Sequence, residues 1–324
     1  MDRQAWFEGK RWGFFTHYLA GLAGDGDGNT MDAEAWNTQV NGFNVSKLAG
    51  QLKEFQPDYF CITIGQNSGH YLAPNHTYDA LTGIVPSKCS RRDLVAELIE
   101  ALEGSGIDLF LYLPSGAPCA DEQAVRALEW QENSKLRDHV EAQDRLVSFQ
   151  RKWEAIIREW SLRWGKSIKG WWIDGCYSPD IMYNFKEEPN FKSLTDAIRA
   201  GNPQAVVALA GGTKCPFILQ SPYDDYTAGE VGWSLPLAID GKADMAYMQE
   251  KLGGKKLHVL SFLGDAWSQG APRFPVELAV GYSKYLWSKD GIITWDAPLK
   301  LDGEIPAEFR EQLKAISRAA KESR

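Results

Sequence analysis

Short apolar runs alternate with amphipathic stretches along most of the chain. The apolar runs are rich in β-branched and aromatic residues and end in polar or glycine-containing turns, which predicts strands over residues 13–19, 58–65, 108–115, 169–175, 205–211, 223–230, 257–264 and 291–298. Between most of them, apolar positions recur three and four residues apart, which predicts helices over residues 46–55, 91–102, 133–164, 193–200, 243–252, 275–287 and 307–320. Ser90 is the expected N-cap of the helix over 91–102.

This alternation predicts the fold class. Strands that alternate with helices pair in parallel through right-handed crossovers, and eight such units in 324 residues favour an α/β fold of the (β/α)₈ TIM-like barrel type. The chain contains no internal repeat, low-complexity tract or linker, so we expect one barrel domain over residues 1–324. It also lacks GxGxxG after the first strand and lacks GxxxxGK[ST] throughout, so nucleotide binding has no support.

Composition and charge narrow the possible partners. The chain is 44% apolar and 24% charged, which is ordinary globular composition, and its net charge of −8 comes without a dense Lys/Arg block. We therefore expect no nucleic-acid partner and no membrane partner, because no apolar run approaches about 18 residues. The N-terminus lacks a signal-peptide pattern, and the five cysteines cannot all pair. A cytoplasmic setting is expected, and a secreted or periplasmic one if a leader has been removed.

Polar, acidic and aromatic residues gather where the predicted strands end, which is the rim that carries the active site in TIM barrels. The segments concerned are 16–18, 65–71, 114–115, 171–175, 230, 265–267 and 295–296. The chain has 13 tryptophans, and large aromatic faces at such a rim suit a polyhydroxylated ligand such as a sugar.

Asp174 is the first candidate for chemistry, because it ends an apolar run and precedes Gly175, so that a strand delivers its carboxylate to a tight turn. A capping role is the alternative for such an aspartate. A carboxylate nucleophile needs a second group that protonates the leaving oxygen. The candidates for that acid are Glu230, Asp224, Asp225, Asp265 and Asp296, although the adjacent Asp224 and Asp225 are typical of a solvated turn.

Histidines and other nucleophiles give weaker signals. His17, His70 and His76 lie near strand ends, but no HxH or HExxH spacing occurs, so we expect neutral hydrogen-bonding groups and neither a metal nor a cofactor. His139 and His258 are expected to be structural. Ser115 is not in a GxSxG elbow, and Cys176 is more typical of a small buried thiol.

With these residues identified, the chain resembles glycoside hydrolase family 29, the retaining α-L-fucosidases. Residues 6–17 are similar to that family's opening W-F-x-x-x-K-F-G-x-F-x-H-W-G, residues 34–36 to its E-W-Y, and residues 170–175 to its W-F-D-G segment. Residues 225–230 resemble its D-x-x-T-x-E stretch, and 290–306 its closing strand and helix. The resemblance implies that His17 contacts a fucose hydroxyl, that Asp174 is the nucleophile and that Glu230 is the acid/base.

Two departures from the family bear on the substrate and the domain organisation. Gln66-Asn67-Ser68-Gly69-His70-Tyr71 replaces the family's H-H-D-G-F after strand two, which removes or rearranges two sugar-binding histidines. The chain ends at residue 324, so we expect no C-terminal β-sandwich.

The resulting hypothesis is a retaining exo-glycosidase that takes an oligosaccharide or glycoside substrate. His17, Gln66, Asn67 and His70 would bind ring hydroxyls, with Tyr71 and Asn75 as further candidates, while Trp36, Trp172, Trp267 and Trp295 would wall the pocket. Retention requires carboxyl groups about 5–5.5 Å apart, and inversion about 6.5–9.5 Å. The alternatives are another α-linked specificity such as α-L-galactoside, a metal-dependent barrel hydrolase, and a sugar-binding pseudoenzyme. The sequence leaves the oligomeric state open.

Overall fold

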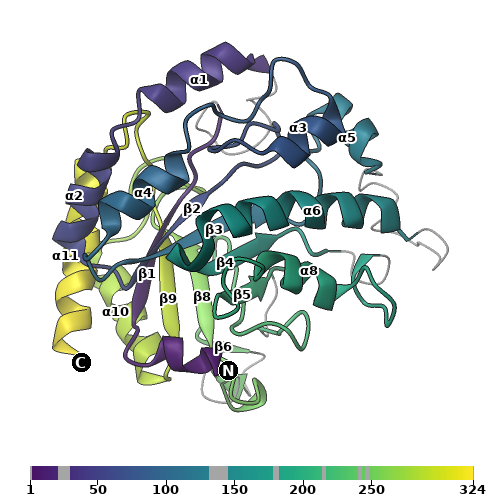
Figure 1. Cartoon of the computed structure of the whole chain (residues 1–324). Coiled ribbons are helices and arrows are strands. Elements are labelled where there is room, and N and C mark those ends of the chain that lie inside the picture. The colour runs from purple at the N-terminus through teal and green to yellow at the C-terminus, as the bar shows by residue number, and fades with distance from the viewer. Residues whose placement is uncertain are drawn as a thin grey trace.

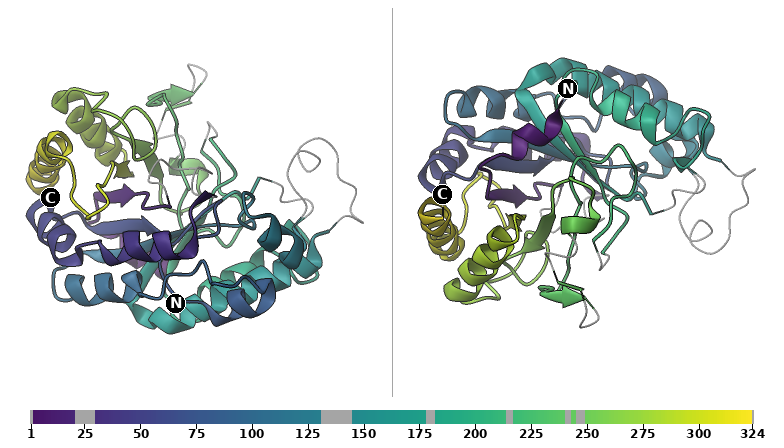
Figure 2. Two further views of the ribbon diagram at one scale, coloured as in Figure 1. Left: turned by 90° about the horizontal axis from the view of Figure 1, so that it is seen from above. Right: turned by 90° about the horizontal axis from the view of Figure 1, so that it is seen from below.

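The computed structural model describes residues 2–20, 30–130, 145–177, 182–213, 217–239, 243–244 and 249–323. Seven strands form one parallel sheet in the order β5-β4-β3-β2-β1-β9-β8, and helices cover its outer face (Figures 1 and 2). The seven strands are β1 (Trp12–Thr16), β2 (Tyr59–Thr63), β3 (Asp108–Pro114), β4 (Ile168–Asp174), β5 (Val206–Leu209), β8 (His258–Phe262) and β9 (Ile292–Asp296). The α/β class, the parallel pairing and these seven strands are confirmed.

The helices agree with the amphipathic pattern where it is long. They are α1 (Ala33–Asn41), α2 (Val45–Phe55), α3 (His76–Thr82), α4 (Leu94–Leu102), α5 (Glu122–Leu128), α6 (Val147–Trp164), α8 (Phe191–Ile198), α10 (Val276–Ser288) and α11 (Ala307–Glu322), with 3₁₀ turns at Arg3–Phe7 and Gly165–Ser167. No helix in these ranges is both long and apolar enough to cross a membrane.

The helix predictions differ from the structure in several places. The N-cap of α4 is Asp93, whose side chain accepts from the Ala96 N–H, and not Ser90. Sequence reasoning missed the short helices α1, α3 and α5, which begin after side-chain caps at Asp32, Asn75 and Asp121. The predicted helix over 243–252 includes β7 (Ala243–Asp244), which pairs with β6 (Ala238–Ile239), and residues 245–248 lie outside the described part. Residues 133–144 of the predicted helix over 133–164 lie outside the described part as well, and within the rest α6 begins at Val147.

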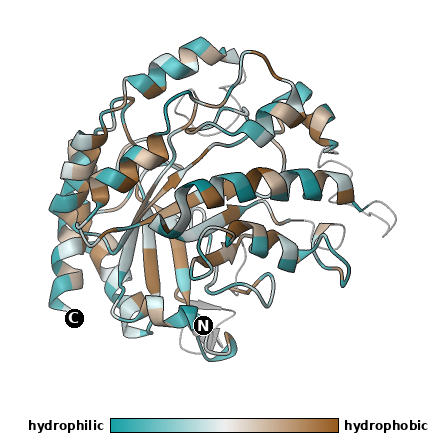
Figure 3. Ribbon diagram, viewed as in Figure 1, coloured by the Kyte–Doolittle hydropathy of each residue, from teal (hydrophilic) through white to brown (hydrophobic). Residues whose placement is uncertain are grey.

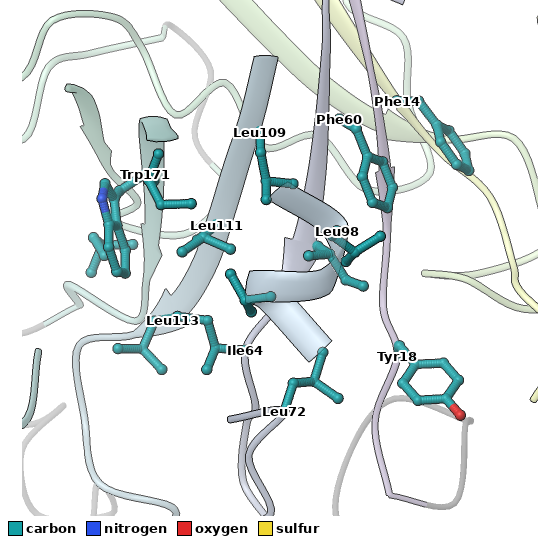
Figure 4. Close-up of a cluster of buried hydrophobic side chains, with 14 of the residues drawn as sticks. Phe14, Tyr18, Phe60, Ile64, Leu72, Leu98, Leu109, Leu111, Leu113 and Trp171 are labelled. Carbon is teal, nitrogen blue, oxygen red and sulfur yellow. The ribbon is translucent and has the colours of Figure 1, made fainter. Parts of the chain in front are cut away.

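The strands are buried on both faces, and alternate residues belong to two separate cores. Outward residues pack against the helices. Figure 3 shows hydrophobic residues along the strands and hydrophobic residues interspersed with hydrophilic ones along the helices. Figure 4 shows part of this outer core, in which Leu98 of α4 lies over side chains from neighbouring strands, among them Phe14, Phe60, Leu109, Leu111, Leu113 and Trp171. Inward residues such as Phe15, Tyr59, Phe110 and Trp172 fill the interior and leave a cavity of only about 10 Å³.

The predicted sixth strand, over 223–230, is not a regular strand. Its backbone nevertheless links the two edge strands of the sheet. Asp225 N donates to Val207 O of β5 (2.8 Å), while Leu260 N of β8 donates to Gly229 O (2.9 Å) and Val231 N donates to Leu260 O (2.9 Å). Glycine is required at 229, because its φ is +62° and a Cβ atom there would lie 1.8 Å from the His258 carbonyl oxygen.

Two buried carboxylates complete this link where backbone pairing is missing. Asp224 accepts from Leu209 N (2.7 Å) and Ser221 N (2.6 Å), and Asp225 accepts from Val207 N (3.0 Å). Asp225 also forms ion pairs with Arg3 (2.9 Å) and with Arg199 (2.6 Å). The expectation that this acidic pair marks a solvated turn is therefore wrong, since both side chains are 1% exposed and bind backbone N–H groups of β5.

We expect Asp225→Ala to lower the free energy of unfolding by about 3–5 kcal/mol, because it leaves Arg199 buried without its partner and removes the acceptor of Val207 N. Urea unfolding measures the loss. The matched control is Asp196→Ala, which breaks the exposed Lys192–Asp196 pair on α8 and should have a much smaller effect. Equal losses in both variants would contradict the importance of the buried link.

Candidate active site

The alternation of strand residues decides which side chains reach the site. Phe15 of β1 points to the inner face of the curled sheet, and His17 lies two residues further on the same side. In the same way Trp172 and Asp174 of β4 point inward, whereas Trp171 belongs to the outer core. Residues of one parity therefore converge at the C-terminal ends of the strands.

These inward side chains enclose a pocket of about 200 Å³. The residues that line it are Phe15, His17, Gln66, Tyr112, Trp172, Asp174, Tyr177, Glu230, Leu260 and Trp267. Two carboxylates thus share one small pocket with aromatic and amide groups, and their surroundings differ.

Asp174 is held by three hydrogen-bond donors. Its Oδ1 accepts from Gly175 N (2.6 Å) and from the Tyr177 hydroxyl (3.0 Å), and its Oδ2 accepts from the Tyr112 hydroxyl (2.6 Å). Donors on both oxygens fix the orientation of the carboxylate and compensate for water lost from around its charge.

Tyr112 is itself fixed from two sides. Its oxygen accepts from Gln66 Nε2 (2.6 Å), and its ring stacks on Trp172 at 5.4 Å between ring centroids. Burial and the neighbouring Asp174 raise the pKa of the Tyr112 hydroxyl well above its ordinary value, so this group remains a donor to the carboxylate. Gln66, Tyr112 and Asp174 form a continuous hydrogen-bonded chain along one wall.

Glu230 has a different environment. Its Oε2 atom is buried and has no hydrogen-bond partner among the described residues. Burial, followed by the charge of Asp174, raises the pKa of Glu230 to about 7. One carboxyl group in the pocket is therefore stabilised by donors, and the other retains a proton near neutral pH.

His17 is positioned by a buried aspartate. Asp296 accepts from both Ser268 N (2.5 Å) and Ser268 Oγ (2.6 Å), and Ser268 Oγ in turn accepts from His17 N (2.7 Å). His17 Nδ1 lies 3.2 Å from the same Ser268 Oγ and 3.6 Å from Asp296 Oδ2. Ser268 has a φ of +48°, which is unusual for a residue with a side chain and shows how tightly this connection is constrained.

The structure brings together both predicted carboxylates and four of the predicted binding residues, which are His17, Gln66, Trp172 and Trp267. Five predicted binding residues lie elsewhere. Trp36, Tyr71 and Trp295 are at most 1% exposed and belong to the outer hydrophobic core. Side chains alternate between the two faces of β9. Thr294 and Asp296 point inward, so Trp295 between them points outward.

The other two displaced residues belong to the loop after β2. His70 packs against Trp36 at 5.6 Å between ring centroids, and burial, with a smaller contribution from Lys88, lowers its pKa to about 4. Asn67 accepts from the Cys119 thiol (3.2 Å) and does not line the pocket. Asn75 is the N-cap of α3, and its Nδ2 donates to Ile156 O (3.0 Å).

The remaining candidates for the acid have structural partners or are exposed. Asp224, Asp225 and Asp296 are buried and bound as described above, and Asp265 is exposed outside the pocket lining. Glu230 is therefore the one member of that candidate set that lines the pocket beside Asp174.

No group of three or more His, Cys, Asp or Glu side chains within the described residues is placed to hold a metal ion. His258 is buried between Thr227 O (2.9 Å) and Thr294 Oγ1 (2.6 Å), which confirms its structural role, and His139 and Cys215 lie outside the described ranges. Cys61, Cys89, Cys119 and Cys176 form no disulfide.

Sequence reasoning missed Tyr112 and Tyr177. Tyr112 could have been found from its parity, because it lies two residues beyond the inward Phe110 on β3 and pairs with Trp172 in the sheet register. Tyr177 carried no comparable signal, since it follows β4 in a loop that bends back over Asp174.

The raised pKa of Glu230 makes a prediction about stability. The pKa of Glu230 is about 7 in the folded protein, against an ordinary value of 4.5. Above pH 7 the ionised side chain therefore lowers the free energy of unfolding by about 3 kcal/mol, and this effect vanishes below pH 4.5. Glu230→Gln removes this destabilisation, because glutamine does not ionise. Its free energy of unfolding relative to the wild type should therefore rise between pH 4.5 and 7 and stay constant above, as measured by urea unfolding at each pH. A difference that does not depend on pH would contradict the assignment.

Neither a protein-family model nor a curated protein sequence matches this chain. Solved structures share its fold. An endo-fucoidan hydrolase of glycoside hydrolase family 107, P5AFcnA, superposes with a TM-score of 0.69 at 16% identity, covering 98% of this chain and 93% of that one. A second, MfFcnA9, gives 0.70 at 17% identity, with coverages of 97% and 63%. The unliganded α-L-fucosidase AlfC from Lactobacillus casei gives 0.66 at 16% identity, with 99% of both chains covered. At these identities, what the chain shares with these fucose-processing hydrolases is the fold.

Proposed function

We propose that this chain is a retaining glycosidase that hydrolyses terminal α-L-fucosides, with Asp174 as the nucleophile and Glu230 as the acid/base. The observation that carries the proposal is the contrast between the two carboxyl groups of one pocket. Asp174 accepts three hydrogen bonds, while Glu230 has a buried oxygen without a partner among the described residues and a pKa of about 7. Opposed environments of this kind separate a nucleophile from a general acid.

In the first step, Asp174 attacks the anomeric carbon and Glu230 gives its proton to the departing oxygen, so the glycosidic bond breaks as the ester bond to Asp174 forms. In the second step, the Glu230 carboxylate takes a proton from water, and the water oxygen attacks the same carbon. Asp174 departs as a carboxylate, and Glu230 is protonated again. Two inversions at one carbon give net retention.

The surrounding residues support these roles. Tyr112 and Tyr177 aim their hydroxyls at the two oxygens of Asp174, which keeps the attacking group in one orientation. Asp174 loses its negative charge when the ester forms and regains it when it departs in the second step. The same two hydrogen bonds then stabilise the departing carboxylate. The stacked Trp172 excludes water from one side of this arrangement.

The pocket lining favours a 6-deoxy sugar. Phe15, Trp172 and Leu260 provide apolar surface beside the polar groups, and L-fucose combines a methyl group with three free ring hydroxyls when bound as a glycoside. His17 and Gln66 are the hydroxyl-binding candidates in the lining, and Gln66 Oε1 is buried without a partner among the described residues. Similarity in fold to an α-L-fucosidase and to fucoidan hydrolases supports the same sugar.

The size of the pocket supports exo action. A volume of about 200 Å³ is below the range of about 300–1,000 Å³ that holds drug-sized ligands, so it suits a single terminal ring.

Asp174→Gly should lower kcat/KM on 4-nitrophenyl α-L-fucoside by at least about 10³-fold, because it removes the nucleophile. Added azide should restore turnover of this variant and give β-L-fucosyl azide. The wild type should release α-L-fucose as the first product. NMR identifies both products. Asp265→Asn, at an exposed strand-end acid outside the pocket, is the control that should stay active. Undiminished turnover of Asp174→Gly would exclude the assignment, and β-L-fucose as first product would mean inversion. Faster turnover of an α-L-galactoside would change the sugar but not the mechanism.

Glu230→Ala should impair substrates with poor leaving groups more than activated aryl glycosides, because only the former need a proton in the transition state. In the wild type, kcat/KM should fall as the pH rises through about 7, since Glu230 then loses the proton that it must donate. This fall should disappear in the variant with an activated aryl substrate. Equal losses on both substrates would identify a different acid.

A further inference from the structure

A second hollow adjoins the active-site pocket. It has a volume of about 590 Å³ and shares Trp267 with the pocket that contains Asp174 and Glu230. Its other lining residues include Val231, Gly232, Trp233 and Phe262, and also the hydroxyl-bearing Thr213 and Ser234. We call this hollow the Trp233 groove.

Trp233 is exceptional among the tryptophans of this chain. All 13 lie in the described residues, and it is the one whose side chain is exposed, at 73%. An indole left in water beside an active-site pocket offers a flat apolar face to a ligand.

Aromatic rings connect the groove with the pocket. The buried Phe262 contacts Trp233 on one side and Trp267 on the other, at 5.3 and 4.9 Å between ring centroids. Trp267 continues the row to His17 at 6.1 Å. A ligand that leaves the pocket past Trp267 therefore meets Trp233 next.

The position of Glu230 shows which end of the substrate faces this row. A general acid must reach the oxygen that departs, so the leaving group lies beyond Glu230 as seen from the sugar being cleaved. The chain runs from Glu230 directly through Val231 and Gly232 to Trp233, and the last three residues line the groove. The acid and the groove wall are thus parts of one continuous segment.

This wall is anchored to the sheet. The Arg273 guanidinium donates to Trp233 O (3.1 Å) and Gly232 O (3.3 Å), and also to Phe262 O (3.0 Å) of β8. Its centre lies 3.9 Å from the Phe262 ring centroid. The backbone of Trp233 is therefore fixed to β8 while its side chain stays free in solvent, which is an arrangement suited to a binding platform.

We propose that the Trp233 groove is a leaving-group subsite, in which the indole of Trp233 stacks against the face of the sugar ring that follows the cleaved bond. The proposal rests on the proposed function, because that function places the leaving group beyond Glu230. It makes the enzyme selective for fucose linked to a second sugar ring over fucose linked to a small alcohol. Stacking depends on the apolar face of a sugar ring and not on its individual hydroxyls, so the subsite tolerates different second sugars.

The test is calorimetric binding in the turnover-blocked Asp174→Asn background. The probes are L-fucose and two disaccharides, α-L-fucosyl-(1→3)-L-fucose and α-L-fucosyl-(1→2)-D-galactose. Adding Trp233→Ala should weaken both disaccharides about tenfold, the size expected for losing one buried ring face, and leave the affinity for L-fucose within about twofold. Trp233→Phe should retain most of the affinity. Leu162→Ala, which removes a 58% exposed side chain on α6, is the control for losing exposed apolar surface and should change nothing.

The outcomes separate the subsite from the proposed function. Equal changes for L-fucose and the disaccharides, or no change for either, would overturn the subsite while the proposed function stands. Failure of L-fucose to bind, with disaccharides still bound through Trp233, would overturn the fucose specificity and keep the subsite. If neither L-fucose nor the disaccharides bind, both proposals are wrong.

Discussion

The link between the two edges of the sheet is the constraint on which the site depends. Within the part of the chain that the structure describes, β5 and β8 have no regular strand between them, and residues 224–231 cross that interval. Asp224 and Asp225 use their carboxylates to satisfy N–H groups of β5 that a strand partner would otherwise satisfy, and Gly229 permits the close approach to β8. Because Glu230 follows Gly229, the geometry that joins the edges also sets the position of the second carboxyl group in the pocket.

The two carboxyl groups of the pocket differ through their surroundings and not through their residue type. Asp174 ends a regular strand, where a turn N–H and two tyrosine hydroxyls reach it. Glu230 ends an irregular segment, and its buried Oε2 has no hydrogen-bond partner among the described residues. Ionising it without donors, close to a second negative charge, is costly, and this cost is what retains the proton. A nucleophile and an acid can thus arise from similar groups in one pocket.

The irregular segment also connects the site with its surroundings. A regular strand would have continued along β8, but residues 231–233 leave the sheet and are held at its rim by Arg273. Trp233, at the end of this segment, has an exposed indole, whereas the stacked Tyr112 and Trp172 of the pocket lining are buried. The proposed leaving-group subsite therefore depends on the same segment that carries Glu230.

The sequence predicted the α/β class, the seven parallel strands and most of the long helices, because periodicity depends on burial that each segment must achieve locally. It also singled out Asp174 and, through a family resemblance, His17 and Glu230. It could not separate Trp172 from Trp295, since both are tryptophans near strand ends and only the strand register determines which one points inward. Nor could it show that Asp224 and Asp225 are buried, because their partners, Arg3, Arg199 and the N–H groups of β5, lie 15 to 222 residues away. The sequence by itself therefore determined the elements and the chemical groups at their ends. The tertiary structure alone decided which of these groups share a pocket and which carboxyl keeps its proton, because burial and hydrogen bonding at a site are properties of segments that meet only in the folded chain.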